Sequence, residues 1–302
     1  MYLVLWIFFA YAFLGWCTEV SFAALVSGKF VNRGFLNGPV CPIYGFGVVI
    51  VLACLEPLRH NLLLLFVGSV LLTSALEWVT GFALEKLFHQ RWWDYSNEPF
   101  NLGGYICLRF SIAWGLACLF VVKIIHPTVL LVIHLIPKPV GIALLVIFSL
   151  IMAVDLVATV RTIAKINRNL GQIDELAAKI KSASNEFGEN LADRVLDAAE
   201  KGADLREELA ERGEDLKENL ADLKEDLTDH WEEHQMDQAL RRAERQESLE
   251  ELRRRLSEVM DQRIFGQRRL LSAFPKMRSL DHKQALEALR RQMEQLRDAR
   301  KS

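Results

Sequence analysis

The chain has 302 residues, of which 51% are hydrophobic and 25% are charged, and its formal net charge at pH 7 is −2. These averages would fit a soluble enzyme only if apolar and charged residues were mixed along the chain. They are segregated, because residues 1–163 carry 7 acidic and 9 basic residues whereas residues 164–302 carry 31 and 27. The composition therefore excludes a soluble globular enzyme and predicts a transmembrane domain over 1–163 followed by a charged helical tail over 164–302.

The first half contains several apolar runs near the roughly 18 to 20 residues that a bilayer-spanning helix needs. Glycine, proline, asparagine or charged residues separate these runs. The pattern predicts an all-α, multi-spanning helix bundle with about five spans, at roughly 2–27, 40–57, 62–88, 104–125 and 139–163. The apolar stretch 126–137 is too short to cross, so we expect it to be a re-entrant or interfacial segment.

Lysine and arginine near the span ends predict the orientation of the bundle. With the N-terminus outside, the inner side holds seven of these residues and the outer side holds three. Because cytoplasmic loops are enriched in positive charge, the bias predicts that the tail is cytoplasmic. The expected location is the bacterial inner membrane, with several passes through it.

Ionisable side chains inside the predicted spans form a candidate binding layer. A charge near mid-bilayer costs roughly 2.5–3.5 kcal/mol, so each one requires a partner or a function. Counting about 1.5 Å per helical residue places them in the inner half of the bilayer. One interpretation is a structural network in which Arg109 neutralises the acids; the other is a site for a proton, a cation or a cationic head group. The candidates are Glu19, Glu77, Glu85, Arg109 and Asp155.

Small residues share helix faces with these acids. Gly15 lies one turn from Glu19, and Gly81 lies one turn from Glu77. Residues four apart occupy the same face of a helix, so the spacing predicts that the acids face protein or a cavity rather than lipid.

Two polar loops follow the first and third predicted spans, and under the predicted topology both lie at the cytoplasmic mouth of the charged layer. The alternative is that the aromatic residues anchor the loops at the interface and that Asp94 pairs with Arg33 or Arg91 to clip them together. The candidate binding residues of the mouth are Asn32, Arg33, Trp92, Trp93, Asp94, Tyr95 and Asn101.

Several unusual tracts occur in a characteristic order over about residues 1–163. They are Gly15-Trp16 with Glu19, the segment from Asn32-Arg33-Gly34 to Tyr44-Gly45, Glu77 with Thr80-Gly81 and Glu85, and Arg91-Trp92-Trp93-Asp94-Tyr95-Ser96 with Asn101. Together they resemble the bacterial membrane family described as "putative ABC-transporter type IV". The resemblance implies a membrane fold and a transporter permease, and it does not cover the tail.

The sequence predicts that the tail is helical from about Ile173. An eleven-residue repeat places an apolar stripe on this helix from Leu205 to Trp231. Residues 185–240 hold 19 acids and 6 bases, whereas 241–302 hold 10 acids and 17 bases. From Leu249 onward the apolar residues follow a seven-residue (heptad) spacing instead. These patterns predict a coiled-coil-like tail whose arms pair with each other or with a second subunit, which would give a homo-oligomer. A basic cluster interleaved with Phe265 and Phe274 is an alternative contact for lipid phosphates or nucleic acid, and solvated charges explain it as well. Its residues are Arg263, Arg268, Arg269, Lys276 and Arg278.

Three classes of function fit these features. The first is a transport-associated or substrate-binding membrane subunit with an inner-half charged cavity. It would need a dimer or a partner such as a separate ATPase subunit, because five spans are few for a solitary transporter and the sequence has no P-loop motif. The second is a structural or regulatory scaffold that recruits partners through the tail, and the third is an intramembrane enzyme acting on a lipid. No recognised catalytic constellation assigns catalytic residues. We expect the lipid bilayer as a partner, nucleic acid as an unlikely one, and neither a cofactor nor a metal.

Overall fold

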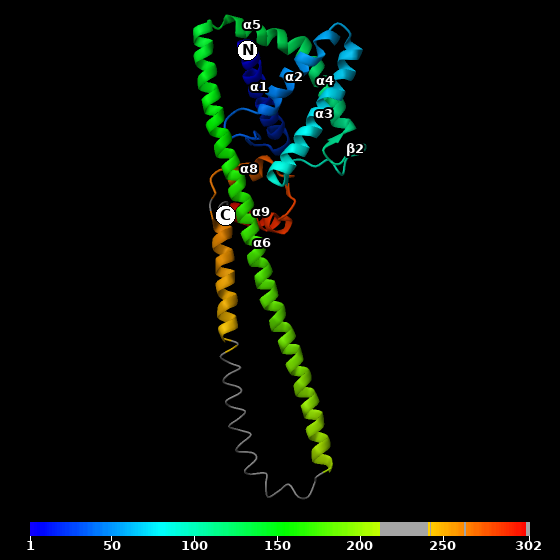
Figure 1. Cartoon of the computed structure of the whole chain (residues 1–302), viewed down its shortest axis with the longest axis vertical. Helices are drawn as coiled ribbons and strands as arrows, with labels where there is room; N and C mark the ends of the chain where they lie inside the picture. The colour runs from blue at the N-terminus through cyan, green and yellow to red at the C-terminus, as the bar shows by residue number, and fades with distance from the viewer. Residues whose placement is uncertain (212–240, 242, 263, 300–302) are drawn as a thin grey trace. The chain divides into compact units, whose positions relative to one another are not determined.

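The structure is a computed structural model that describes residues 1–211, 241, 243–262 and 264–299 (Figure 1). It contains two compact units. The first consists of Met1–Leu170 together with Arg263–Ser302, and the second is Gly171–Gln262. These units divide the chain differently from the two domains expected from composition. The reason is that the end of the tail packs with the apolar half, through contacts that composition does not encode.

The first unit is built mainly from helices whose ends follow local sequence signals. Gly28 ends the first helix in the left-handed conformation at φ 67°, where a side chain would be strained. The Asn61 side chain caps α3 by accepting hydrogen bonds from the backbone N–H groups of Leu63 and Leu64. The helices are α1 (Tyr2–Ser27), α2 (Pro42–Leu55), α3 (Leu62–Phe88), α4 (Leu108–Phe120), α5 (His126–Leu135) and α6 (Lys138–Glu211).

Among the described residues, four helical stretches are long and apolar enough to cross a membrane. They are Tyr2–Ser27, Leu62–Phe88, Leu108–Leu135 and Lys138–Asn185. The fifth expected span, at 40–57, corresponds to the shorter apolar helix Pro42–Leu58, so the count of five is not confirmed. Many large apolar side chains on these helices are exposed, as expected for surfaces that face lipid.

The sequence predicts that the helix ends between 104–125 and 126–137, but the structure has a helical bend there instead. A π-helical turn, Val121–Ile125, joins α4 to α5, and Pro127 is the second residue of α5. Both features bend helices because they disrupt the regular backbone hydrogen bonds. Figure 1 shows α5 turning away from the direction of α4. The re-entrant or interfacial role of 126–137 stays a prediction.

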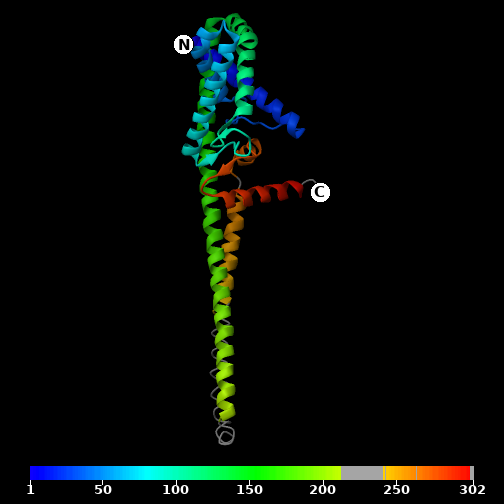
Figure 2. The same cartoon turned by 90° about the vertical axis from the view of Figure 1, so that its right-hand side faces the viewer.

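Short strands tie the loops of the first unit together. Strands β2 (Asn101–Leu102) and β3 (Ile106–Cys107) form an antiparallel pair within one loop. Strand β1 (Gln90–Arg91) pairs in antiparallel fashion with β4 (Arg278–Ser279), so two segments far apart in the sequence share a ladder. Two further helices of the first unit, α8 (Gln267–Ala273) and α9 (Lys283–Asp298), flank β4 in the sequence. Helix α9 is the red helix near the C-terminus in Figure 2.

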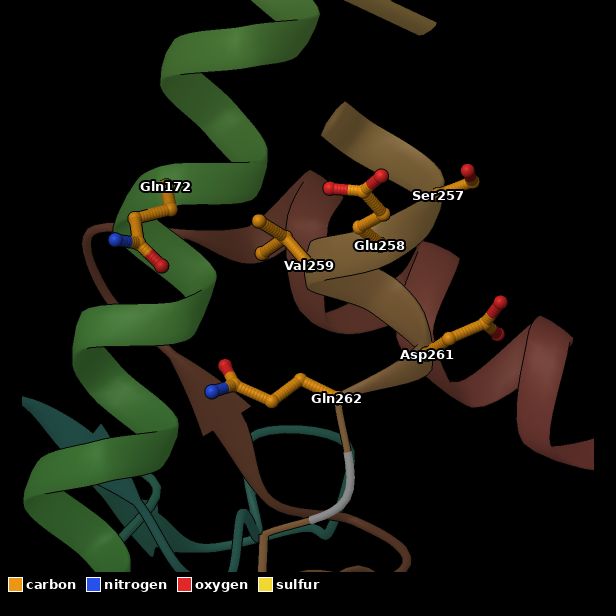
Figure 3. Close-up of a pocket in the computed structure, with 6 residues that line it drawn as sticks. All are labelled: Gln172, Ser257, Glu258, Val259, Asp261 and Gln262. Atoms are coloured by element: carbon orange, nitrogen blue, oxygen red, sulfur yellow. The ribbon is translucent and has the colours of Figure 1, made fainter. Parts of the chain in front are cut away.

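The second unit contains the continuation of α6 and a helix over residues 243–261. The heptad residues Leu249, Leu252, Leu256 and Val259 are half-buried, which fits helix packing but does not confirm a coiled coil. Figure 3 shows a surface hollow where Gln172 of α6 faces residues 257–262, and most of the side chains around it are exposed. Most of the eleven-residue stripe, from Leu216 to Trp231, lies outside the described residues.

Candidate functional site

Glu19 of α1 is held by partners from two other segments. The hydroxyl of Tyr44, in the first turn of α2, donates a hydrogen bond to Glu19 Oε1 at 2.6 Å. Arg33 Nε lies 3.4 Å from Glu19 Oε2. A Cβ atom at Gly15 would lie 2.3 Å from Tyr44 Cγ, so glycine one turn before Glu19 is what lets the tyrosine ring approach. The charge of Glu19 is therefore compensated within the protein.

Glu77 of α3 has the same kind of surroundings but no cation among the described residues. The Tyr95 hydroxyl donates to Glu77 Oε1 at 3.3 Å. Oε2 is buried without a hydrogen-bond partner in the described part of the chain. One turn further along α3, a Cβ at Gly81 would lie 2.9 Å from Tyr105 and 3.1 Å from Trp93. A buried carboxylate oxygen without a partner is costly, which distinguishes Glu77 from Glu19.

Tyr95, the hydrogen-bond donor to Glu77, is held in its protonated form by its surroundings. Burial raises the pKa of its phenol, and the charges of Glu77 and, more weakly, Glu19 raise the pKa further. The hydroxyl therefore remains protonated at neutral pH and serves as a donor. Its ring stacks on Phe110 of α4 with 4.8 Å between ring centroids, which fixes where the hydroxyl points.

Glu85 belongs to a separate ionic network with Arg91 and Asp94. Arg91 Nε lies 2.8 Å from Glu85 Oε2, and Arg91 Nη1 lies 3.8 Å from Asp94 Oδ1. Arg278, from β4, approaches the other oxygen of Asp94 at 2.7 Å. Burial alone would raise the pKa of Asp94, but hydrogen bonds from Ser96 and the two arginines outweigh it and hold the pKa below its ordinary value. Of the two predicted clips through Asp94, the structure shows the one with Arg91.

Asp155 of α6 accepts hydrogen bonds from the segment that joins α1 to α2. Its Oδ1 accepts hydrogen bonds from the Asn37 backbone at 3.1 Å and the Asn37 side chain at 2.7 Å. Its Oδ2 accepts from the Gly38 backbone at 2.7 Å. The carboxylate thus satisfies two N–H groups of the segment between α1 and α2, residues 28–41, which we name the first loop.

The first loop has little regular structure, and both its own Asn32 and residues of α1 satisfy its polar groups. The Asn32 side chain accepts from Trp16 at 2.8 Å and from the backbone of Gly34, and it donates to the Asn37 carbonyl. At its end, the Cys41 backbone donates to the Ala12 carbonyl, in the middle of α1. The loop therefore enters the bundle, and α2 starts partway along α1, which explains why α2 is short. Irregular backbone at this depth is tolerated only where protein satisfies it.

Residues 89–107, which we name the second loop, satisfy much of their own backbone. The Asn101 side chain donates to the carbonyls of Ser96 and Glu98 and accepts from the Gly104 N–H. The Trp93 indole donates to the Tyr105 carbonyl at 2.9 Å. Trp92 is buried between Phe35 of the first loop and Phe274 of the C-terminal segment, at centroid distances of 5.2 and 4.9 Å. Asn101, Trp92 and Trp93 thus have structural contacts, and a binding role for them stays a prediction.

Arg109 lies apart from the acids it was expected to neutralise. It is exposed, its guanidinium lies 5.9 Å from the Phe110 ring centroid, and no ion pair joins it to an acid of the described residues. The ion pairs expected of Arg109 are made instead by Arg33, which pairs with Glu19, and by Arg91, which pairs with Glu85. Helical depth could not reveal this, because depth along one helix does not say which neighbour a side chain faces.

The site also contains residues that the sequence did not single out for this role. Arg269 of α8 donates to the carbonyls of Gly34 at 2.7 Å and Phe35 at 3.1 Å. Burial lowers its pKa and the nearby Asp155 opposes that shift, but an arginine remains charged at neutral pH. Arg269 and Arg278 belong to the basic cluster noted in the tail, and only a three-dimensional contact could assign them to the two loops.

The comparisons agree with the membrane character of the apolar half. The family model described as "Putative ABC-transporter type IV" matches residues 6–160, which is slightly more than half of the chain and includes both loops. Neither a curated protein nor a solved structure matched the chain. The match stops before the second unit and the C-terminal segment. The chain is a membrane protein that belongs to the family described as putative ABC-transporter type IV.

Proposed function

We propose that this protein is the membrane subunit of a transport system and that Glu77 binds a positively charged group of its substrate. The observation that carries the proposal is the buried Oε2 of Glu77, which has no hydrogen-bond partner among the described residues. A carboxylate in an apolar helix is costly unless it takes up a proton or meets a positive charge. Glu77 is therefore the acid that can exchange partners.

The other acids of the candidate layer support this choice by contrast. Glu19 has Arg33 and Tyr44, Glu85 has Arg91, and Asp155 has the backbone of the first loop. Each of these contacts would have to break before a ligand could bind. Structural contacts that do not involve Arg109 thus account for three of the acids, and the proposed binding site consists of Glu77 with Tyr95.

The family supports a transport role, and the sequence lacks a P-loop, so the proposal includes a separate ATPase subunit. The experiment is to purify the tagged full chain from its native membranes in mild detergent and to measure copurifying, vanadate-sensitive ATP hydrolysis. We expect Glu77→Gln to retain the ATPase subunit but to lower the hydrolysis, and Glu56→Gln, at an exposed acid outside the candidate layer, to serve as the matched control. Absence of an ATPase, or wild-type hydrolysis with Glu77→Gln, would contradict the proposal.

The proposal also places the protein in a bacterial inner membrane, with both loops and the tail on the cytoplasmic side. The support is the excess of lysine and arginine near these loops. An impermeant thiol reagent applied from outside should label a cysteine placed at Asn61 and should miss one placed at Ser96. The reverse pattern would show the opposite orientation.

Association through the tail remains part of the proposal, supported by the half-buried heptad residues of 243–261. Light scattering of the full chain in detergent tests it. Neither a scaffold function nor lipid-modifying activity gains a supporting observation from the described residues or the family match.

A further inference from the structure

The C-terminal segment, residues 264–299, holds the first loop. Arg269 bridges the consecutive carbonyls of Gly34 and Phe35 at 2.7 and 3.1 Å. These groups lie in irregular backbone, so without Arg269 they would be buried acceptors with poorer partners. The Thr162 hydroxyl of α6 donates to the Phe265 carbonyl at 3.2 Å, which anchors the same segment to a membrane helix.

The same segment also holds the second loop. Arg278 Nη1 lies 2.7 Å from Asp94 Oδ2, and β4 pairs with β1 at the start of this loop. The ring of Phe274 meets the buried ring of Trp92 edge to face at 4.9 Å. Charge, backbone pairing and aromatic packing thus act together, which makes this a specific interface rather than a single surface ion pair.

The two arginines contact the loops beside the residues that reach the acids. Arg269 binds the carbonyl of Gly34, and the preceding residue, Arg33, is the cation on Glu19. Arg278 binds Asp94, and the following residue, Tyr95, donates to Glu77. A displacement of either loop would therefore move the group that faces the acid.

We propose that residues 264–299 form a regulatory clasp in which Arg269 and Arg278 are positioning residues for the Glu19 and Glu77 sites. The clasp sets Arg33 and Tyr95 in place, and its release lowers substrate-dependent activity. The regulatory part rests on the function proposed above for Glu77. The clasp follows the helix 243–261 directly in the chain, so the second unit is covalently joined to it.

Two buried cysteines report on the loops without an engineered label. Cys41 ends the first loop and is 4% exposed, and Cys107 closes the second loop and is 1% exposed. Cys54, near the end of α2, is exposed and serves as an internal reference. The experiment measures how fast each cysteine of the full chain is alkylated in detergent. Peptide mass spectrometry distinguishes the cysteines.

We expect Arg269→Ala to accelerate alkylation of Cys41 by about tenfold or more, since it removes two charge-assisted hydrogen bonds. Arg278→Ala should accelerate alkylation of Cys107 by a smaller factor. The matched control is Arg268→Ala, which changes the exposed neighbour of Arg269, and Cys54 should react equally in all variants. Equal rates at Cys41 in Arg269→Ala and Arg268→Ala would overturn the clasp.

A second experiment tests the clasp if the Arg269→Ala variant fails to accumulate. A specific protease site placed between Gln262 and Arg263 is cut after purification, and the membrane part is then washed in high salt to remove the clasp. Loss of the segment should expose Cys41 and Cys107 in protein that has already folded. Unchanged alkylation after removal of the segment would overturn the proposal.

The regulatory part has its own measurement. In the copurified complex, Arg269→Ala should lower ATP hydrolysis, Arg269→Lys should restore part of it, and Arg269→Ala added to Glu77→Gln should cause no further loss. Faster alkylation with unchanged hydrolysis would overturn regulation and leave the clasp structural. A wild-type result for Glu77→Gln instead marks failure of the proposed function, and the alkylation rates still test the clasp.

Discussion

The first and second loops satisfy their polar groups in different ways. The first loop enters the bundle with irregular backbone and, besides its own Asn32, depends on the distant side chains of Asp155 and Arg269 for hydrogen bonds. The second loop forms its own strand pair and uses Asn101 to satisfy its own carbonyls. The first loop brings a cation to its acid, Glu19, whereas the second brings only a tyrosine to Glu77. The comparison shows that two acids with similar surroundings differ in one respect: Glu19 has a cation beside it, and Glu77 has none among the described residues.

Glu19 and Glu77 share one feature, which is a glycine one helical turn away on the same helix. At Gly15 and Gly81 the missing side chain makes room for an aromatic ring from a neighbouring segment. The difference lies in the arginines. Arg33 reaches Glu19, but Arg91 of the second loop is already engaged by Glu85 and Asp94.

The largest expected effect comes from removing the support of the first loop. Asp155→Ala should lower the free energy of unfolding by about 2–4 kcal/mol, because two backbone N–H groups lose their acceptor. Asn101→Ala in the second loop should cost only about 1 kcal/mol, since exposed backbone there can turn to water. Thermal unfolding in detergent measures both. Equal losses would show that the two loops do not differ in their dependence on distant side chains.

A second effect tests the shared glycine design. Gly15→Ala should destabilise the protein by about 1–3 kcal/mol, because its Cβ would overlap the Tyr44 ring and push the hydroxyl away from Glu19. Gly81→Ala should cost less, because the nearest ring atoms are 2.9 and 3.1 Å away and need to move less. Unfolding temperatures compare the two, with Gly47→Ala as the control because its Cβ would meet open space. The reverse order would argue against this account of the two sites.

The third expected effect is that neutralising Glu77 and neutralising Glu19 change the free energy of unfolding in opposite directions. Glu77→Gln should leave stability unchanged or raise it by about 1 kcal/mol, since it removes a buried charge that has no cation. Glu19→Gln should lower stability by up to about 1 kcal/mol, since it leaves Arg33 without its partner. The double variant Glu19→Gln with Arg33→Ala should recover part of that loss. Destabilisation by Glu77→Gln similar to that by Glu19→Gln would remove the distinction on which the proposed function depends.

Sequence reasoning identified the elements whose signals are local. The apolar runs predicted the long helices, and the spacing of Gly15 and Glu19 and of Glu77 and Gly81 predicted close approach beside the acids. The partners of the acids were not predictable in this way. Arg269 lies 235 residues from Gly34, and no periodicity relates them. The choice of Arg33 over Arg109 depends on how deeply the first loop enters the bundle, which tertiary packing decides.

The smallest expected effect is the response of the second loop to acid. The pKa of Asp94 is held below its ordinary value of 3.8, so its carboxylate stabilises the folded state above that pH and loses this contribution as the pH falls through the lowered pKa. The contact with Arg278 should persist from pH 7 to about 4 and weaken only below that. The effect on stability should be below about 1 kcal/mol, because Arg278 is 58% exposed and water screens the pair. The rate at which Cys107 reacts with an aromatic disulfide reagent that modifies thiols at acid pH, measured at each pH, fixes the midpoint, and Asp94→Asn should abolish the acid step. A midpoint near pH 6 in the wild-type protein would contradict this assignment and would point to a group other than Asp94 as the one that holds the second loop.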